Sequence, residues 1–166
     1  MTRRHLMKFF SLLGLGQAAA KAATPAATPT ADGPAIEPLR LSDAEWQRRL
    51  SPAQYDVLRK HGTERAGTSE LNREKRTGIF RCAGCELALF SSSTKYESGT
   101  GWPSFYAALP GAVATSRDFK LVMPRTEYHC ARCEGHQGHI FDDGPQPTGK
   151  RYCNNGVALK FAPASA

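Results

Sequence analysis

The chain has 166 residues, of which 22 are basic, 15 are acidic and 40% are hydrophobic, and its formal net charge is +7. This composition suits one globular domain and excludes a collagen, a coiled coil and wholesale disorder, since no heptad or Gly-X-Y period is present. Four of the basic residues and none of the acids lie in residues 1–22, which leaves 18 basic against 15 acidic residues in the rest. The remainder shows no basic run paired with aromatic residues, so a nucleic-acid partner is not expected.

The N-terminal residues predict an export signal. Arg3 and Arg4 precede a short apolar pair and a lysine, which resembles a twin-arginine signal. Residues 9–20 form an uncharged stretch of the length of a signal peptide's apolar region, too short for a stable membrane span. Small residues favour cleavage after Ala20 or Ala22. The alternative is a disordered basic tail, but the order of charge, apolar run and small residues favours export to a bacterial periplasm.

Three segments are predicted along the chain. Residues 1–22 are the signal peptide, residues 23–38 are a linker rich in Ala, Thr and Pro, and residues 39–163 are the folded domain.

Two capping boxes predict short helices at the start of the domain. Ser42 caps a helix expected to reach Leu50, and Ser51 caps a second expected to reach about Lys60. Gly62 is expected to end the second helix in the left-handed conformation.

The remainder predicts a mainly β fold. Short apolar runs broken by turn residues are typical of a small antiparallel fold with helices gathered at one end. The expected strands are residues 79–82, 87–90, 119–123, 127–130, 139–141 and 157–161.

Four of the five cysteines form two C-x-x-C pairs separated by 44 residues, Cys82 with Cys85 and Cys130 with Cys133. Two such knuckles facing each other make a tetrahedral four-cysteine site, which zinc prefers. Three alternatives are open: disulfides in an oxidising compartment, a thioredoxin-type redox pair, or replacement of cysteine ligands by histidines of the segment 135–139. A structural zinc is favoured, because neither pair opens a helix within a βαβ unit and the histidines are spaced too tightly.

The fifth cysteine, Cys153, is left without a partner. Arg151 would lie on the same face of a strand and favour the thiolate, and His136 and His139 are available as proton donors. Cys153 is therefore a candidate nucleophile. The alternative is that Cys153 is only a small, buried apolar residue.

Together these motifs resemble the type B methionine sulfoxide reductases. The resemblance covers residues 40–162 in unbroken order. The matching stretches are residues 62–65, 71–75, 98–105, 125–127, 135–139, 141–145 and 151–153.

The resemblance implies a fold of two small antiparallel sheets with a zinc ion on Cys82, Cys85, Cys130 and Cys133. It implies reduction of the R epimer of methionine sulfoxide in oxidised proteins or peptides. Implied roles are the nucleophile (Cys153), acid catalysis or sulfoxide binding (His139 and His136), hydrogen bonding near the nucleophile (Asn155), binding of the substrate methyl group (Trp102), and positioning of the cysteine (Arg151 and Asp143). The alternatives without a catalytic or binding role are core packing for Trp102, structural hydrogen bonding for His136 and turn formation with Gly156 for Asn155. His61 and His129 are expected to be ordinary residues.

The sequence departs from one common family pattern at Thr100, where many members carry a recycling cysteine. With the zinc bound, Cys153 has no partner within the chain, so a small thiol or a thioredoxin-like protein is expected to reduce its sulfenic acid. A less favoured route recruits a zinc cysteine and ejects the metal.

The protein is expected to be a monomer. The competing hypothesis is a zinc-knuckle binding module of related fold without redox activity, which would not need Cys153, Trp102 and both histidines together.

Overall fold

The computed structural model describes residues 36–119 and 123–165, all within one compact unit. The predicted signal peptide, both cleavage sites and most of the predicted linker lie outside the described residues. Within the described part of the chain, no helix combines the length and the apolar character needed to cross a membrane.

The two predicted capping boxes are present. Helices α1 (Asp43–Arg49) and α2 (Pro52–Lys60) each begin with a serine that accepts from the backbone of the third helical residue, while that residue's side chain accepts from the serine N–H. The prediction for the end of α2 is wrong by one residue. His61, not Gly62, takes the left-handed conformation, with φ of 56°. A Cβ at Gly62 would instead lie 2.0 Å from Asp56 Oδ2, so the glycine is needed for a close approach.

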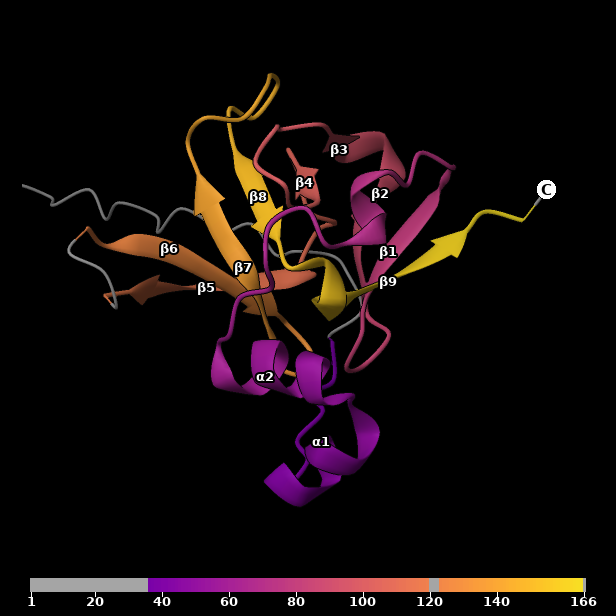
Figure 1. Cartoon of the computed structure of the whole chain (residues 1–166), viewed down its shortest axis with the longest axis vertical. Helices are drawn as coiled ribbons and strands as arrows, with labels where there is room; N and C mark the ends of the chain where they lie inside the picture. Colours follow the sequence, from indigo (N-terminus) through magenta and orange to yellow (C-terminus); the bar gives the residue numbers. More distant parts are fainter. Residues whose placement is uncertain (1–35, 120–122, 166) are drawn as a thin grey trace, which may run out of the picture. The chain divides into compact units, whose positions relative to one another are not determined.

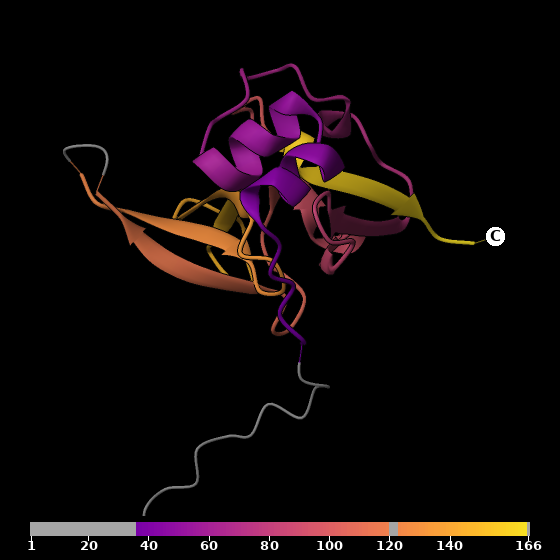
Figure 2. The ribbon, with the colours of Figure 1, turned by 90° about the horizontal axis from the view of Figure 1, so that it is seen from below.

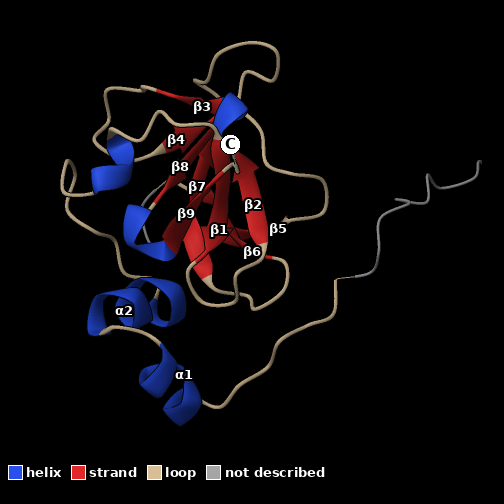
Figure 3. Ribbon diagram, turned by 90° about the vertical axis from the view of Figure 1, so that its right-hand side faces the viewer, coloured by secondary structure: helices blue, strands red, loops and turns tan. Residues whose placement is uncertain are grey.

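The strands form two antiparallel sheets, as expected (Figures 1 and 3). The smaller sheet has the order β2-β1-β9 and the larger has the order β3-β4-β8-β7-β6-β5. The strands are β1 (Gly78–Cys82), β2 (Ala88–Ser91), β3 (Lys95–Tyr96), β4 (Ser104–Phe105), β5 (Val113–Asp118), β6 (Arg125–Cys130), β7 (His136–Phe141), β8 (Arg151–Asn154) and β9 (Leu159–Pro163). Among the described residues, one short 3₁₀ turn, Glu70–Asn72, lies between α2 and β1, and two more, Ser92–Thr94 and Gly156–Ala158, lie between strands.

One predicted strand is misplaced. Of the expected strand at residues 119–123, residues 120–122 lie outside the described residues, and the described ends, Phe119 and Met123, are not in a strand. The strand lies just before this run, at β5, whose residues are mostly exposed. The expected strand at residues 157–161 begins later, since Gly156–Ala158 is a 3₁₀ turn that leads into β9.

Aromatic side chains fill the space between the sheets. Phe80 of β1, Phe90 of β2, Phe105 of β4 and Tyr128 of β6 are fully buried. Phe90 stacks on Phe105 with ring centroids 4.2 Å apart, and Phe80 meets Phe105 edge-on at 4.9 Å. These contacts pack one sheet on the other and hold the larger sheet, which carries the candidate site, in place. Both helices lie at one end of the strands (Figure 1), in front of them when seen from below (Figure 2).

Candidate active site and metal centre

The two cysteine pairs form matching turns at the ends of β1 and β6. In each turn the residue after the second cysteine is left-handed, Glu86 at φ of 64° and Glu134 at 57°. Each of these residues donates its N–H to the carbonyl of the first cysteine, Glu86 to Cys82 and Glu134 to Cys130, both at 2.9 Å. The chain thereby reverses within four residues and points both sulfur atoms of a pair the same way.

The four cysteines come together in one buried cluster, which could hold a metal ion. Their sulfur atoms all lie within 4.8 Å of one another. The Sγ atoms of Cys82 and Cys133 are 3.6 Å apart and those of Cys85 and Cys130 are 3.4 Å apart, far beyond a disulfide bond. The cysteines are therefore free thiols, and a set of four sulfur ligands fits zinc.

The electrostatics of the cluster favour a bound cation. Hydrogen bonds among the thiols, together with burial, raise the pKa of Cys82 and Cys133, while hydrogen bonds lower the pKa of Cys85 and Cys130. Four thiolates cannot share so small a space without a cation. Arginine side chains fix the backbone of the two turns. Arg49 and Arg59, from the two helices, donate to the Gly84 carbonyl at 2.7 Å and to the Cys133 carbonyl at 2.9 Å. Arg132, within the second turn, donates to the Cys85 carbonyl of the first turn at 3.2 Å.

Cys153 is half-buried in β8, in the middle of the larger sheet, and is not part of the four-cysteine cluster. In the antiparallel register it is directly opposite His139 of β7, which in turn is opposite Glu127 of β6. Residues opposite each other across a ladder point to the same face. One row across three strands therefore carries a thiol, an imidazole and a carboxylate.

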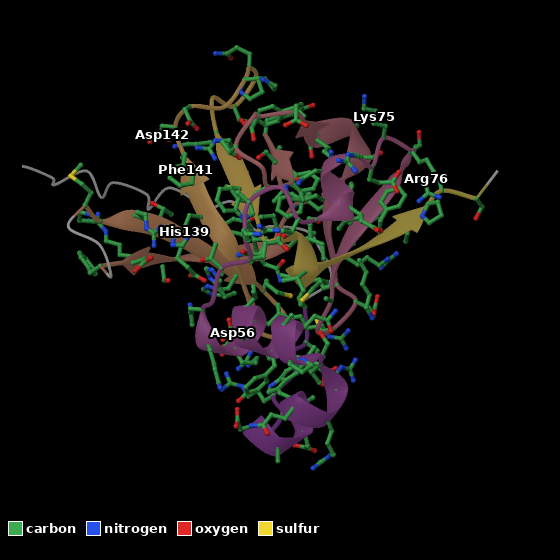
Figure 4. The ribbon with its side chains drawn as sticks, viewed as in Figure 1. Asp56, Lys75, Arg76, His139, Phe141 and Asp142 are labelled. Atoms are coloured by element: carbon green, nitrogen blue, oxygen red, sulfur yellow. The ribbon has the colours of Figure 1, made fainter. Side chains whose placement is uncertain are left out.

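A cavity of about 140 Å³ opens beside this row. Trp102, Phe141, His139, Cys153 and Asn155 are among its lining residues. The Trp102 ring is held by a hydrogen bond of 3.1 Å from Nε1 to the Glu64 carbonyl. Phe141 lies two residues beyond His139 on β7, where both are labelled in Figure 4. The cavity thus has aromatic walls and a polar end with a thiol.

His139 is part of a hydrogen-bonded row of charged side chains. Its Nε2 is 2.7 Å from Asp118 Oδ2, and Arg125 donates to the same oxygen at 2.6 Å. Burial lowers the pKa of His139 below its usual value, the bond to Asp118 opposes this shift, and the positive charge of Arg125 adds to it. The imidazole is therefore mostly neutral near pH 7 and fixed in orientation.

His136 shares a face with His139 although the two are three residues apart. The pairing of β6 with β7 shifts register, so that Tyr128 pairs with Gly138 but His129 pairs with His136, which leaves Gln137 without a partner in the ladder. A bulge of this kind re-aims the following side chain. The rings of His136 and His139 lie 5.5 Å apart, centroid to centroid.

His136 is buried and tied to Glu127. Its Nδ1 is 2.7 Å from Glu127 Oε1, and the other oxygen of Glu127 accepts from Ser116 at 2.7 Å and contacts His129 Nδ1 at 3.0 Å. Burial alone would raise the pKa of Glu127, but its hydrogen bonds to the two histidines and the serine hold that pKa far below the usual range.

Two opposing effects act on the pKa of the Cys153 thiol. Burial raises its pKa, while the positive charge of Arg151 and hydrogen bonds from Thr100 and Arg151 act in the opposite direction without overcoming it. Arg151 is itself fixed by two bonds of 2.8 Å to Asp143 and by stacking on Phe141 at 4.3 Å. The expected influence of Arg151 is thus present, but it only moderates a raised pKa.

Asn155 lines the cavity and ties three segments together. Its Oδ1 accepts from the Glu64 N–H at 3.0 Å, and its Nδ2 donates to the Gln137 carbonyl at 3.0 Å. The Glu64 carboxylate accepts from the N–H groups of Gly156 and Val157, so it caps the 3₁₀ turn that follows β8.

The structure brings all the predicted non-metal site residues to one region of the larger sheet. Asp118, Arg125, Glu127 and Glu64 were missed as members of this region. Glu127 had a usable signal, since it occupies an inward position of a strand that was expected. Asp118 had none, because the strand that carries it is too polar to show an alternating pattern.

A free, half-buried thiol opposite an imidazole, on a β scaffold with a four-cysteine cluster, defines the class of thiol enzymes with a structural metal site. Comparison with known proteins narrows this class. Residues 50–163 match the SelR domain, so the chain belongs to the SelR domain family.

Close relatives are peptide methionine sulfoxide reductases of type B. The chain is 52% identical over 122 residues to "Peptide methionine sulfoxide reductase B1, chloroplastic" of Arabidopsis thaliana, a match that covers 73% of this chain and 60% of the relative. It is 50% identical over 123 residues to the MsrB of Agrobacterium fabrum, covering 74% of this chain and 91% of the relative. The chain thus spans about three fifths of the plant relative but nearly all of the bacterial one. The solved Mis18 "Yippee-like" domain aligns over 55% of this chain and all of its own at 16% identity and a TM-score of 0.43, too weak a similarity to support an argument.

Proposed function

We propose that the protein reduces the R epimer of methionine sulfoxide in oxidised proteins or peptides. The observation that carries this proposal is the pairing of Cys153 with His139 across β7 and β8, at the polar end of a cavity with aromatic walls. The family supports it, because members of similar length carry the reductase name.

The cavity suits the substrate's shape and charge. Trp102 and Phe141 offer apolar faces for the methyl group on the sulfur atom. The sulfur is then placed next to Cys153 and its oxygen toward His139. Arg151 and Asp143 act on Cys153 rather than on the substrate, and Asn155 positions the strand end.

The chemistry has one transfer step. The Cys153 thiolate attacks the sulfoxide sulfur and forms a transient sulfur–sulfur bond while His139 protonates the oxygen. The sulfur–oxygen bond then breaks, the hydroxyl group passes to Cys153, and the sulfur–sulfur bond breaks with its electron pair left on the substrate sulfur. The substrate sulfur gains two electrons and leaves as methionine, while Cys153 loses two and becomes a sulfenic acid. His136, held by Glu127, supports the position of His139 and the polarity of the site.

Regeneration uses an external thiol. Thr100 stands where a recycling cysteine would be, and the other four cysteines belong to the buried cluster. A small thiol or a thioredoxin-like protein condenses with the sulfenic acid and releases water, and a second thiol then frees Cys153.

We further propose that Cys82, Cys85, Cys130 and Cys133 hold one structural zinc ion, which supplies cross-linking and no redox chemistry. The protein acts as a periplasmic monomer after residues 1–22 are removed, with residues 23–38 as a linker to the domain at residues 39–163. Sequencing the N-terminus of protein from the native host tests the location, since a start at Met1 or Thr2 contradicts it.

Turnover of the separated epimers tests the activity. With dithiothreitol present, the protein is expected to consume R-methionine sulfoxide within a peptide and to leave the S epimer untouched. Cys153→Ser is expected to abolish the reaction. Equal consumption of both epimers, or turnover by Cys153→Ser, would overturn the proposal and revive the binding-module hypothesis.

A further inference from the structure

A second group of metal-ligand side chains lies apart from the four cysteines. His61, Glu127 and His136 each offer one ligand atom, and these atoms all lie within 4.8 Å of one another. His61 follows α2, Glu127 belongs to β6 and His136 begins β7. The end of α2 and two consecutive strands thus bring two imidazoles and one carboxylate together.

Two of the three ligands are held rigidly. His136 is 2% exposed and Glu127 is 3% exposed, and their side chains are 2.7 Å apart. The second oxygen of Glu127 is held by Ser116 and His129, which fixes the carboxylate plane. Metal sites in proteins depend on this kind of outer support, because it orients the ligands before the ion arrives.

The third ligand is placed at the surface with a defined backbone. His61 is exposed, its left-handed backbone ends α2, and its ring centroid lies 4.9 Å from that of His136. Ligand atoms on one tetrahedral zinc ion lie about 3.3 Å apart, given metal–ligand bonds of about 2.0–2.2 Å. An inward shift of the exposed His61 ring by about 1.5 Å or less brings all three ligand atoms to the spacing that one ion requires.

The site also has room for a fourth ligand. A cavity of about 210 Å³ is lined by all three residues. Two histidines and one glutamate with an open position form a ligand set that zinc adopts, and imidazole also suits cobalt, nickel and copper.

We infer that His61, Glu127 and His136 form a second metal site, which binds a divalent transition-metal ion of the zinc type with an open coordination position. This cavity shares Thr63, Arg125 and His139 with the cavity beside Cys153, so the two cavities are neighbours, and the three ligands line only the first. Binding of the ion at this site does not depend on the reductase activity.

Cobalt titration of protein that holds one equivalent of zinc per chain, on the four cysteines, tests the inference. The protein is expected to bind one further equivalent of Co²⁺, giving weak visible bands of a nitrogen and oxygen site without the near-ultraviolet absorption of a cobalt–thiolate bond. His61→Asn should weaken this binding at least about tenfold, because asparagine tolerates the left-handed conformation but removes the imidazole. Lys60→Asn is the matched control, since it introduces the same side chain on the neighbouring exposed residue, and it should bind like the parent protein.

Three results would overturn the second site. The first is no further equivalent at cobalt concentrations up to about 1 mM. The second is equal affinity in His61→Asn and Lys60→Asn. The third is a thiolate band that grows with the added equivalent, which would place the ion on cysteine.

Discussion

Cys153 is buried enough that its thiol resists ionisation, and the surrounding residues offset this only in part. Arg151 contributes a positive charge and a hydrogen bond, and Thr100 contributes a second hydrogen bond. Ser98 bonds to Thr100 at 2.8 Å and to Ser104 at 2.8 Å, so the Thr100 hydroxyl ends a chain of three hydroxyls. Thr100, where the resemblance implies a recycling cysteine in many family members, is thus a hydrogen-bond donor to Cys153.

The charge of Arg151 is tested by the reactivity of the thiol. Arg151→Gln removes the charge that favours the thiolate, so the pKa of Cys153 should rise further and its alkylation midpoint should move to higher pH. Asp142→Asn, a change in a neighbouring exposed acid that pairs with Lys150, should leave the midpoint in place. An unchanged midpoint in Arg151→Gln would contradict this role.

His139 gives the reaction a characteristic pH dependence. The pKa of His139 is lowered below 6.5 and the pKa of Cys153 is raised above 9.0. Between these two pKa values, the fraction of molecules that carry both a thiolate and an imidazolium is small and does not change with pH. The kcat/KM of the parent protein should therefore be flat in this range and fall on both sides. His139→Gln should lose about 10²- to 10⁴-fold and should instead gain activity with rising pH, because only the thiolate remains to be formed. A flat profile in His139→Gln would argue against acid catalysis by His139.

At the scale of elements, the site depends on the pairing of β7 with β8. Gly138 lies against β8 so closely that an added Cβ would be 1.9 Å from the Cys153 carbonyl oxygen. The expected strand at residues 139–141 captured the second half of β7 but not its bulged start, since a bulge leaves no trace in an alternating pattern. Strands β3 and β4 have two residues each, too short for any periodic signal. Capping boxes, by contrast, are read directly from local residue types, and both were predicted.

Gly138→Ala tests this pairing. The added methyl group should push β8 away, lower the free energy of unfolding by about 1–3 kcal/mol and reduce turnover by displacing Cys153. Gly84→Ala is the control, because its Cβ would have no neighbour closer than 3.6 Å. Urea unfolding and peptide turnover measure both effects, and equal behaviour of the two variants would contradict the account.

At the scale of the whole molecule, the four-cysteine cluster joins the two sheets. One cysteine pair begins at the last residue of β1 in the smaller sheet, and the other begins at the last residue of β6 in the larger sheet. Gln137 extends this link toward the site, since its Nε2 donates to Cys82 Sγ at 3.4 Å and its Oε1 accepts from Asn154 at 3.4 Å. The spacing of the cysteines was enough to predict the cluster. The inward position of Glu127 could be predicted, but the partners of Glu127 and Asp118 could not, because they depend on which polar residues the register places opposite each other.

Removal of the metal should therefore loosen both sheets. Chelation under reducing conditions is expected to lower the melting temperature by at least about 10 °C, because the cross-link between the sheets is lost. Cys82→Ser should melt at a similarly reduced temperature, whereas Cys153→Ser should stay close to the parent protein. An unchanged melting temperature in Cys82→Ser would show that the cluster does not stabilise the fold.

The central claim is that Cys153 alone carries the redox chemistry. Its most direct test is a single turnover: reduced, zinc-loaded protein is mixed with a peptide containing R-methionine sulfoxide and a sulfenic-acid trap, without added reductant. The account predicts one methionine per chain, the trap on Cys153, and no release of zinc. Methionine formed without a trapped Cys153 and with release of zinc would contradict it, because a cluster cysteine would then have taken part.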